Sequence, residues 1–243
     1  MMQNKLISPH KDAMGRMLLD YLGGEHAAAV QVFSPHLDMA EMTGELMCRS
    51  FSEMNNMEQL ALETCRGRVL DVGGGSGCHS LHLQDQGMAV TALDISPGCV
   101  TAMEMRGVTQ VHHQSLTDFT EGPWDTVLML MNGIGLCGSL EGVDTFFEFL
   151  HTLLAPGGQL LADSTDLGAY ADLVPEGDRD VLAAGSWETE FTVTYDKMTS
   201  DPFDWLYIDF DTLARIAAEH GFHCEELCQG EMGQFLARIL KQD

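Results

Sequence analysis

The sequence predicts an α/β fold in which helices cover both faces of a doubly wound, mostly parallel sheet. Two observations carry this prediction. Residues 68–80, RVLDVGGGSGCHS, contain a short apolar run, then four glycines within five residues, and then the start of helical spacing. From residue 66 to residue 161, apolar runs of strand length alternate with segments of helical spacing. This alternation is typical of parallel strands joined by helices.

The glycine turn in residues 73–77 predicts a ligand site. A strand, a glycine turn and a helix start bring backbone N–H groups and the positive helix end together, and the missing Cβ atoms let a ligand contact the backbone. A dinucleotide fingerprint needs a glycine at the sixth position, where this chain has Cys78. The turn therefore indicates a nucleotide-type cofactor other than a dinucleotide. The alternative is a glycine-rich turn that binds nothing.

Residues 1–65 precede this turn and are expected to be helical. Apolar residues with helical spacing are Met14, Met17, Leu18, Leu19 and Leu22, then Leu37, Met39, Ala40, Met42, Leu46 and Met47, then Leu60 and Leu62. We expect a helical cap over the pocket.

Polar side chains end the next strands of the sheet. Residues 89–93 form the second strand, which ends at Asp94, 23 residues after Asp71. A carboxylate at this position can accept both hydroxyl groups of a ribose, although an Asp before Ser-Pro can also be a helix cap. A weaker third strand covers residues 108–112. The fourth, residues 124–130, opens into Asn132-Gly133, where ligands of such sheets bind, unless this pair is only a tight turn.

The pattern changes after Asp163. Residues 188–195 and 203–210 alternate polar and apolar side chains, which predicts two antiparallel strands inserted into the domain. A helix over residues 213–220 and a hairpin of residues 222–228 and 235–240 end the chain.

Two motifs resemble the class I S-adenosylmethionine-dependent methyltransferase family. The run Asp71-x-Gly73-x-Gly75-x-Gly77 resembles its motif I, and residues 153–161, LLAPGGQLL, resemble its L-x-P-G-G turn and fifth strand. The resemblance implies a Rossmann-like, seven-stranded, mostly parallel sheet whose last strand is antiparallel. It also implies S-adenosylmethionine as cofactor, bound by a domain of residues 66–243 in which residues 168–210 are an inserted hairpin or lid.

The resemblance also implies the residues that bind the cofactor. In this family, the acid matching Asp71 faces the amino group of the methionine moiety, and the acid matching Asp94 binds the ribose. Ser115 stands where the family usually has an acid for the adenine amino group, so that contact falls to Ser115 and Leu116 or to Asp118. Asn132 is expected beside the methyl group. The complete set of expected cofactor contacts is Asp71, Gly73, Gly74, Gly75, Gly77, Asp94, Ile95, Ser115, Leu116 and Asn132.

The composition limits the possible partners. The 37 acidic and 12 basic residues give a formal charge of −25, which repels nucleic acids and anionic membranes and favours cationic small molecules. No window reaches the roughly 18 uncharged apolar residues of a membrane-spanning helix. Seven cysteines without a framework of pairs indicate free thiols, so we expect a cytoplasmic protein without a bound metal.

The function predicted from the sequence is methyl transfer to a small-molecule acceptor through an N, O or C atom. The alternatives are an aminopropyl transferase of the same fold and a non-catalytic module that binds the cofactor. No residue can be assigned as the catalytic base. The candidates in segments expected to overhang the pocket are His26, His36, Glu188, Glu190, Tyr195 and Tyr207.

Overall fold

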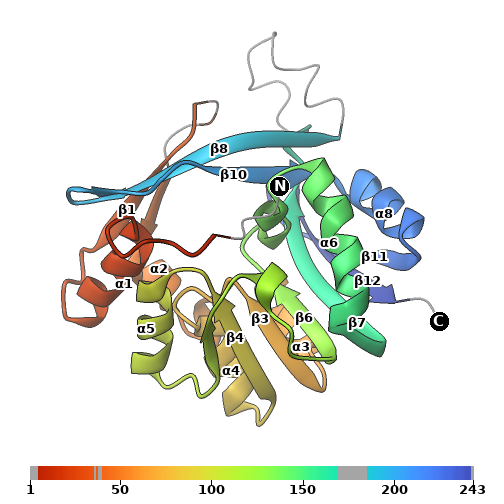
Figure 1. Cartoon of the computed structure of the whole chain (residues 1–243), viewed down its shortest axis with the longest axis horizontal. Helices are drawn as coiled ribbons and strands as arrows, with labels where there is room; N and C mark the ends of the chain where they lie inside the picture. Colours follow the sequence, from red (N-terminus) through yellow and green to blue (C-terminus); the bar gives the residue numbers. More distant parts are fainter. Residues whose placement is uncertain (1–4, 36, 38–39, 169–184, 242–243) are drawn as a thin grey trace.

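The computed structural model describes residues 5–35, 37, 40–168 and 185–241, and it contains two sheets (Figure 1). The larger sheet has seven strands in the order β11-β12-β7-β6-β3-β4-β5. These strands are β3 (Arg68–Val72), β4 (Ala89–Asp94), β5 (Val111–His113), β6 (Trp124–Met129), β7 (Leu154–Thr165), β11 (Phe222–Gln229) and β12 (Gln234–Lys241). The strands β3 to β7 pair in parallel, whereas β12 pairs antiparallel with both β7 and β11.

Helices cover both faces of this sheet because successive side chains of each strand point to opposite sides. On one face, Val127 and Leu160 pack against α6 (Leu140–Leu153) and α8 (Phe210–Glu219). On the other face, Leu128 and Leu161 pack against α3 (Asn56–Thr64) and α4 (Cys78–Asp85). A further helix, α5 (Pro97–Arg106), connects β4 to β5. The doubly wound, seven-stranded, mostly parallel sheet predicted from the sequence is confirmed.

The second sheet corrects the prediction that residues 1–65 are helical throughout. Helices form at α1 (Ala13–Leu22), α2 (Gly44–Met47) and α3, with the 3-10 helix η1 (Phe51–Glu53), but β1 (Ala29–Phe33) and β2 (Ala40–Thr43) are strands. They pair antiparallel with each other, and β1 also pairs with β8 (Ser186–Tyr195). Strand pairing, of β2 with the nearby β1 and of β1 with the distant β8, thus overrides the expected helical structure, as tertiary context often does.

The remaining strands of the second sheet come from the predicted insertion. Strand β8 pairs antiparallel with β10 (Phe203–Ile208) and with the short β9 (Met198–Thr199), which confirms the antiparallel pair expected from residues 188–195 and 203–210. Residues 169–184 of the insertion lie outside the described residues. In Figure 1, β8 and β10 cross above the seven-stranded sheet, next to α6. We call this second sheet the roof.

Candidate active site

A cavity of about 640 Å³ lies between the carboxyl ends of β3 and β4 and the roof, and this volume is typical of a small-ligand site. The side of the larger sheet, which we call the floor, contributes Val72, Gly73, Gly75, Leu93, Asp94, Ile95, Leu116 and Leu136, among others. The roof contributes Val193, Phe203, Asp204 and Trp205, together with Ser200, Asp201 and Pro202 from the β9–β10 connection. The N-terminal segment adds Lys5, Leu6, Ile7, Ser8, Lys11 and Asp12.

The glycines of the turn after β3 have two different roles. Gly73 and Gly75 line the cavity, with left-handed φ angles of 71° and 58°. Gly74 and Gly77 do not line it, and they allow close packing instead. A Cβ on Gly74 would lie 2.9 Å from Met103 Sδ, and one on Gly77 would lie 2.8 Å from a methyl group of Val108.

The N–H groups at the start of this turn are not free. The N–H groups of Gly73 and Gly74 donate to the carbonyl oxygen of Leu93, and that of Gly75 donates to Asp94. These three donors are therefore used within the protein. Gly73 and Gly75 therefore contribute to the cavity chiefly through the absence of side chains.

Asp94 ends β4 in the cavity wall, where the sequence places the ribose acid. Its Oδ2 accepts a hydrogen bond from Gly75 N at 2.9 Å, and its Oδ1 accepts one from Ser96 N at 2.8 Å. Burial raises the pKa of Asp94 to about 6, although these two backbone donors act in the opposite direction. Ile95 lies beside it in the same wall. Both residues are thus placed to contact a bound cofactor.

The expected adenine contacts separate in the structure. Leu116 lines the cavity, as does Gln114, which the sequence reasoning missed. Ser115 is buried and is the N-cap of η2 (Leu116–Asp118), where its hydroxyl accepts from Asp118 N at 3.3 Å and donates to the Asp118 carboxylate at 3.0 Å. Ser115 therefore shapes this turn from outside the cavity wall.

Asp71 lies beneath the turn instead of in the cavity wall. Its side chain is buried and accepts a hydrogen bond from Ser80 Oγ at 2.6 Å, which ties β3 to the first turn of α4. Burial raises the pKa of Asp71, while His79 and Ser80 act to lower it. The carboxylate that motif I places near the cofactor thus holds the turn in place here.

A buried charged cluster of Arg49, Glu58 and His79 lies next to Asp71. The guanidinium of Arg49 and the ring Nε2 of His79 both contact Glu58 Oε1, the latter at 2.9 Å. Burial alone would raise the pKa of Glu58, but the hydrogen bonds from His79 and Arg49 outweigh it and lower that pKa to about 2. Burial alone would lower the pKa of His79, but hydrogen bonds to Cys78 and Glu58 raise it to about 10. The ion pair between Glu58 of α3 and His79 of α4 joins these two helices.

Asn132 follows β6 in a left-handed conformation, with φ of 58°. Its N–H donates to Asp163 Oδ2 at 2.9 Å, the N–H of Gly133 donates to Asp163 Oδ1 at 3.2 Å, and Thr165 Oγ1 donates to Asn132 Oδ1 at 2.6 Å. Burial raises the pKa of Asp163 to about 6. Asn132 itself does not line the cavity, so these contacts position the turn. The sequence reasoning missed the role of Asp163, because only the folded structure brings it to the turn after β6.

This turn also joins the floor to the roof. It continues into the 3-10 helix η3 (Gly133–Cys137), whose Leu136 lines the cavity. A Cβ on Gly135 would lie 2.2 Å from the indole of Trp205 on β10, so only glycine allows this contact. The position of the roof therefore depends on η3.

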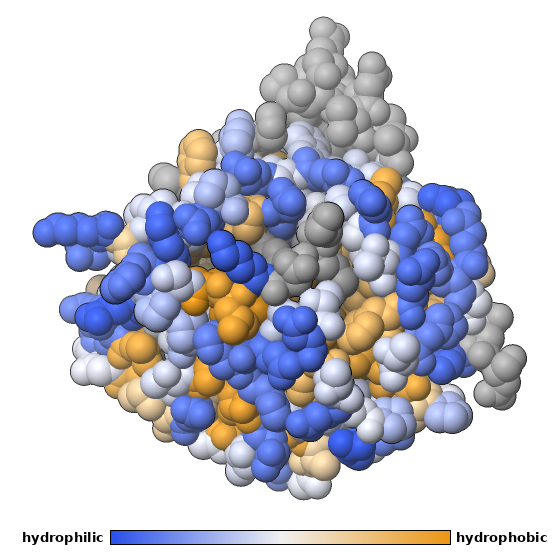
Figure 2. All heavy atoms as spheres, viewed as in Figure 1, coloured by the Kyte–Doolittle hydropathy of each residue, from blue (hydrophilic) through white to orange (hydrophobic). Residues whose placement is uncertain are grey.

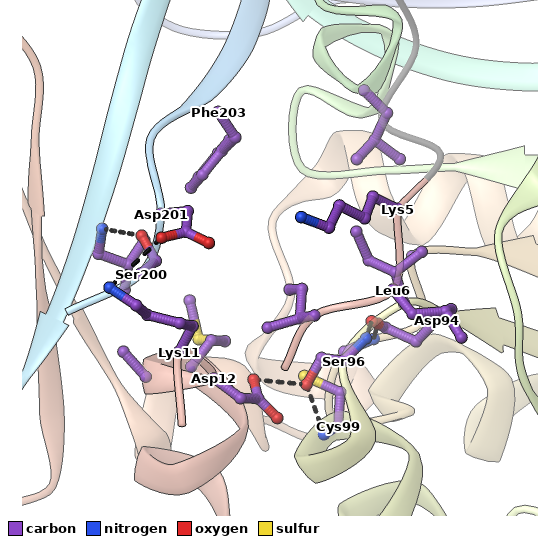
Figure 3. Close-up of a pocket in the computed structure, with 18 of the residues that line it drawn as sticks. Lys5, Leu6, Lys11, Asp12, Asp94, Ser96, Cys99, Ser200, Asp201 and Phe203 are labelled. Atoms are coloured by element: carbon purple, nitrogen blue, oxygen red, sulfur yellow. Dashed lines mark hydrogen bonds and ion pairs between the residues drawn. The ribbon is translucent and has the colours of Figure 1, made fainter. Parts of the chain in front are cut away.

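The N-terminal segment and the roof meet across the cavity, as Figure 3 shows. Lys11 forms an ion pair of 3.3 Å with Asp201, and Phe203 points into the same space. On the face drawn in Figure 2, apolar groups lie near the centre and hydrophilic side chains surround them, in line with the high content of acids. The sequence reasoning did not identify the lining residues of the N-terminal segment or those of the roof.

None of the candidate bases within the described residues lies in the cavity wall. His26 packs edge-on against Tyr21, and Glu188 accepts a hydrogen bond from Leu140 N at 2.9 Å. Glu190, Tyr195 and Tyr207 are also absent from the lining, and His36 lies outside the described residues. The described geometry assigns no base.

Two absences hold for the part of the chain that the structure describes. No group of three or more His, Cys, Asp or Glu side chains there is arranged to hold a metal ion. In that same part, no helix has both the length and the apolar character to cross a membrane. All seven cysteines are described, and all are free thiols.

The parallel sheet, the glycine turn and the carboxylate at the next strand end define a cofactor-binding protein of the Rossmann-like class. The model of the "Methyltransferase domain" family matches residues 48–227, so the chain belongs to this family. A solved S-adenosylmethionine-dependent methyltransferase from Bacteroides fragilis, in complex with S-adenosylhomocysteine, is 39% identical, with a TM-score of 0.89, and the match covers 98% of this chain and 99% of that one. No curated protein matches the chain.

More distant solved structures share the fold. The glycopeptide N-methyltransferase MtfA is 16% identical, with a TM-score of 0.56 over 80% of this chain and 92% of that one. The CcbJ methyltransferase from Streptomyces caelestis is 14% identical, with a TM-score of 0.58 over 79% and 95%. The family match and the 39% identical structure together show that the chain is an S-adenosylmethionine-dependent methyltransferase, and not an aminopropyl transferase or a non-catalytic module.

Proposed function

We propose that the enzyme binds S-adenosylmethionine on the floor of the cavity and methylates a small acceptor that carries an amine beneath the roof. The observation that carries this proposal is the composition of the roof side. Phe203, Trp205, Asp201 and Asp204 are among its lining residues within five consecutive positions, and the carboxylate of Asp201 also pairs with Lys11. Aromatic faces and carboxylates are the groups that bind organic cations.

The floor fits the cofactor. The cavity walls at Gly73 and Gly75 lack side chains, and Asp94 offers carboxylate oxygens at the end of β4. We assign the hydrogen bonds to the ribose to Asp94 and a contact beside the ribose to Ile95. We assign the contacts with the adenine to Leu116 and Gln114. When bound, the cofactor supplies a methyl group on a positively charged sulfur. The protein's part is to align the acceptor with that methyl group and to exclude water.

In this proposal, the other residues predicted to contact the cofactor act indirectly, by holding the turns around the cavity. Asp71, Gly74 and Gly77 keep the turn in shape through Ser80, Met103 and Val108. Ser115 and Asn132 fix the turns that carry Leu116 and Leu136.

The aromatic rings of the roof form one continuous face. Phe203 packs edge-on against Trp205 with ring centroids 6.2 Å apart, and its direct partner across the strands is Phe191, also at 6.2 Å. Phe203 and Trp205 are half-buried, which leaves part of each ring open. A cation above such a ring gains about 0.5–2 kcal/mol. An ammonium acceptor gives its proton to solvent water before transfer, because only the neutral amine has the lone pair that attacks the methyl group.

The remaining proposals concern organisation and location. We treat residues 66–243 as the cofactor-binding domain and residues 1–65 as an N-terminal cap over the same cavity. Within the domain, residues 168–210 are an insertion that acts as a lid. Seven free thiols and a cofactor made inside cells favour a cytoplasmic location. The excess of 37 acids over 12 bases disfavours nucleic acid as a partner.

The test combines binding and turnover. Calorimetry with S-adenosylmethionine, S-adenosylhomocysteine and NADH should show binding of the two adenosyl ligands alone. Release of S-adenosylhomocysteine is then measured with aryl-alkyl amines, the matching alcohols and the matching carboxylates. We expect turnover with the amines. Turnover confined to alcohols or carboxylates would contradict the proposed acceptor class without affecting the cofactor assignment.

A matched pair of variants locates the acceptor. Phe203→Leu removes a ring that lines the cavity, whereas Phe191→Leu removes its cross-strand partner, which does not line it. Phe203→Leu should raise KM for the amine by about tenfold, equivalent to about 1.4 kcal/mol, and Phe191→Leu should change it far less. Equal effects of the two changes would place the acceptor elsewhere.

A further inference from the structure

The N-terminal segment of residues 5–11 lies along the cavity before α1 begins. Five of its residues line the cavity, and Ile7 N donates a hydrogen bond to the carbonyl oxygen of Ile95 at 2.9 Å. Ile95 is the neighbour of Asp94, so this segment lies directly beside the residues assigned to the ribose. Asp12 directly follows this segment.

Asp12 joins the start of two helices. Its buried carboxylate accepts from Gly15 N at 3.0 Å and thereby caps α1. The same carboxylate accepts from Ser96 Oγ at 2.7 Å and from Gly98 N at 2.7 Å, at the start of α5. The two helix starts are in close contact, because a Cβ on Gly98 would lie 2.5 Å from Gly15 Cα. A cap of α1 alone would need only the first of these three hydrogen bonds.

The hydrogen bonds continue from Asp12 to the glycine turn. Ser96, held by Asp12, donates its N–H to Asp94 Oδ1 at 2.8 Å, and Gly75 donates to Asp94 Oδ2 at 2.9 Å. Figure 3 shows Asp12, Ser96 and Asp94 in this order along the wall of the cavity. Both oxygens of Asp94 are therefore oriented by backbone groups, and one of these backbone groups is fixed through Asp12.

We propose that Asp12 is a positioning residue for the cofactor: through Ser96 it orients Asp94, and it holds residues 5–11 against the bound ribose. The inference rests on the proposed role of Asp94. If Asp12 has this role, the positioning of residues 5–11 along the cavity and the binding of the cofactor are coupled. Cofactor should then protect the chain from trypsin at Lys5 and Lys11.

The test uses Asp12→Ser. Serine is a favoured N-cap, so the cap of α1 is kept, but its short side chain gives up the hydrogen bonds to Ser96 and Gly98. We expect the Kd for S-adenosylhomocysteine to rise about tenfold and KM for S-adenosylmethionine to rise with it, while kcat at saturating cofactor stays within about twofold. Tryptic cleavage at Lys11 should no longer be slowed by the cofactor.

The matched control is Asp209→Ser. Asp209 caps α8 through Thr212 N at 2.6 Å and does not line the cavity, so its Kd should stay within about twofold of the wild-type value. If Asp12→Ser fails to fold, Ser96→Ala tests the same link, because it removes the hydroxyl that donates to Asp12 and leaves the cap of α1 and the hydrogen bond from Gly98 in place. A wild-type Kd in the folded variant overturns the inference.

A double-mutant cycle with Asp94→Ala separates the possible failures. If Asp12 acts largely through Asp94, adding Asp12→Ser to Asp94→Ala weakens binding by clearly less than the tenfold that Asp12→Ser costs alone, because the residue to be oriented is gone and only the hold on residues 5–11 is still lost. Additive losses would mean that Asp12 acts independently and would overturn the proposal. An unchanged Kd in Asp94→Ala itself would instead refute the ribose assignment on which both proposals rest.

Discussion

The floor and the roof of the cavity differ in how the chain builds them. The parallel strands of the floor follow one another between Arg68 and Thr165, and the connections between them include α4, α5 and α6. The roof pairs β1 with β8, so that Gln31 lies opposite Thr194. The glycine turn and the carboxylate at the end of β4 belong to the floor, whereas Phe203 and Trp205 belong to the roof. In the proposed function, cofactor binding and acceptor choice therefore depend on different parts of the molecule and can be separated by mutation.

The largest effect is expected beneath the floor, at Glu58. Glu58→Ala removes the partner of two buried cations, Arg49 and His79, and should cost about 3–5 kcal/mol of unfolding free energy. Denaturant titration measures this loss. Glu219→Ala breaks an exposed pair with Arg215 and should cost at most about 1 kcal/mol. Similar losses in both variants would show that the buried cluster does not support the floor.

Gly75→Asp should separate cofactor binding from folding. The new side chain would sit in a left-handed backbone conformation, 3.2 Å from Met47 at its Cβ, and would bring a second carboxylate beside Asp94. We expect affinity for S-adenosylhomocysteine to fall by about a hundredfold or more, while circular dichroism still shows a folded protein. Binding near the wild-type level would refute the placement of the cofactor on this turn.

Gly135→Ala tests the junction between floor and roof. The added methyl group would lie 2.2 Å from the indole of Trp205, so the roof must shift, at a cost of about 1–3 kcal/mol. We expect kcat/KM for the acceptor to fall, with little change in cofactor affinity. Adding Trp205→Phe relieves the overlap and should restore part of the lost stability. A variant with wild-type turnover would show that the junction does not position the roof.

The smallest effect is the pH dependence of cofactor affinity. Asp94 has a pKa of about 6 in the folded protein, and only its charged form accepts hydrogen bonds through both oxygens. Affinity should therefore be constant above about pH 6 and fall below it, by at most about tenfold per pH unit. Calorimetric titrations at pH values above and below 6 measure how steeply the affinity falls. In Asp94→Asn this slope should be absent, and its persistence would assign it to another group.

The same difference between floor and roof decides how much could be predicted from the sequence. Residues 68–80 are a strand, a turn and a helix start within one short stretch, and Asp94 follows at a typical distance, so the strands and the glycine turn of the floor were predicted correctly. The predicted contacts Asp71, Ser115 and Asn132 do not line the cavity, because hydrogen bonds within the protein hold them in or beneath the turns. Strand β2 was missed because Ala40 and Met42 fit helical spacing. Strand β1 was missed because it was included in a region expected to be helical throughout, and its second partner, β8, is far away in the chain. Asp12 and Asp163 were missed because only tertiary contacts bring them to Ser96 and Asn132.

The division into floor and roof is tested most directly by one calorimetric titration of S-adenosylhomocysteine into three proteins: the wild type, Gly75→Asp and Phe203→Leu. We predict that the wild type and Phe203→Leu bind with similar affinity and that Gly75→Asp binds at least about a hundredfold more weakly. Tight binding by Gly75→Asp, or a loss in Phe203→Leu as large as that in Gly75→Asp, would contradict it.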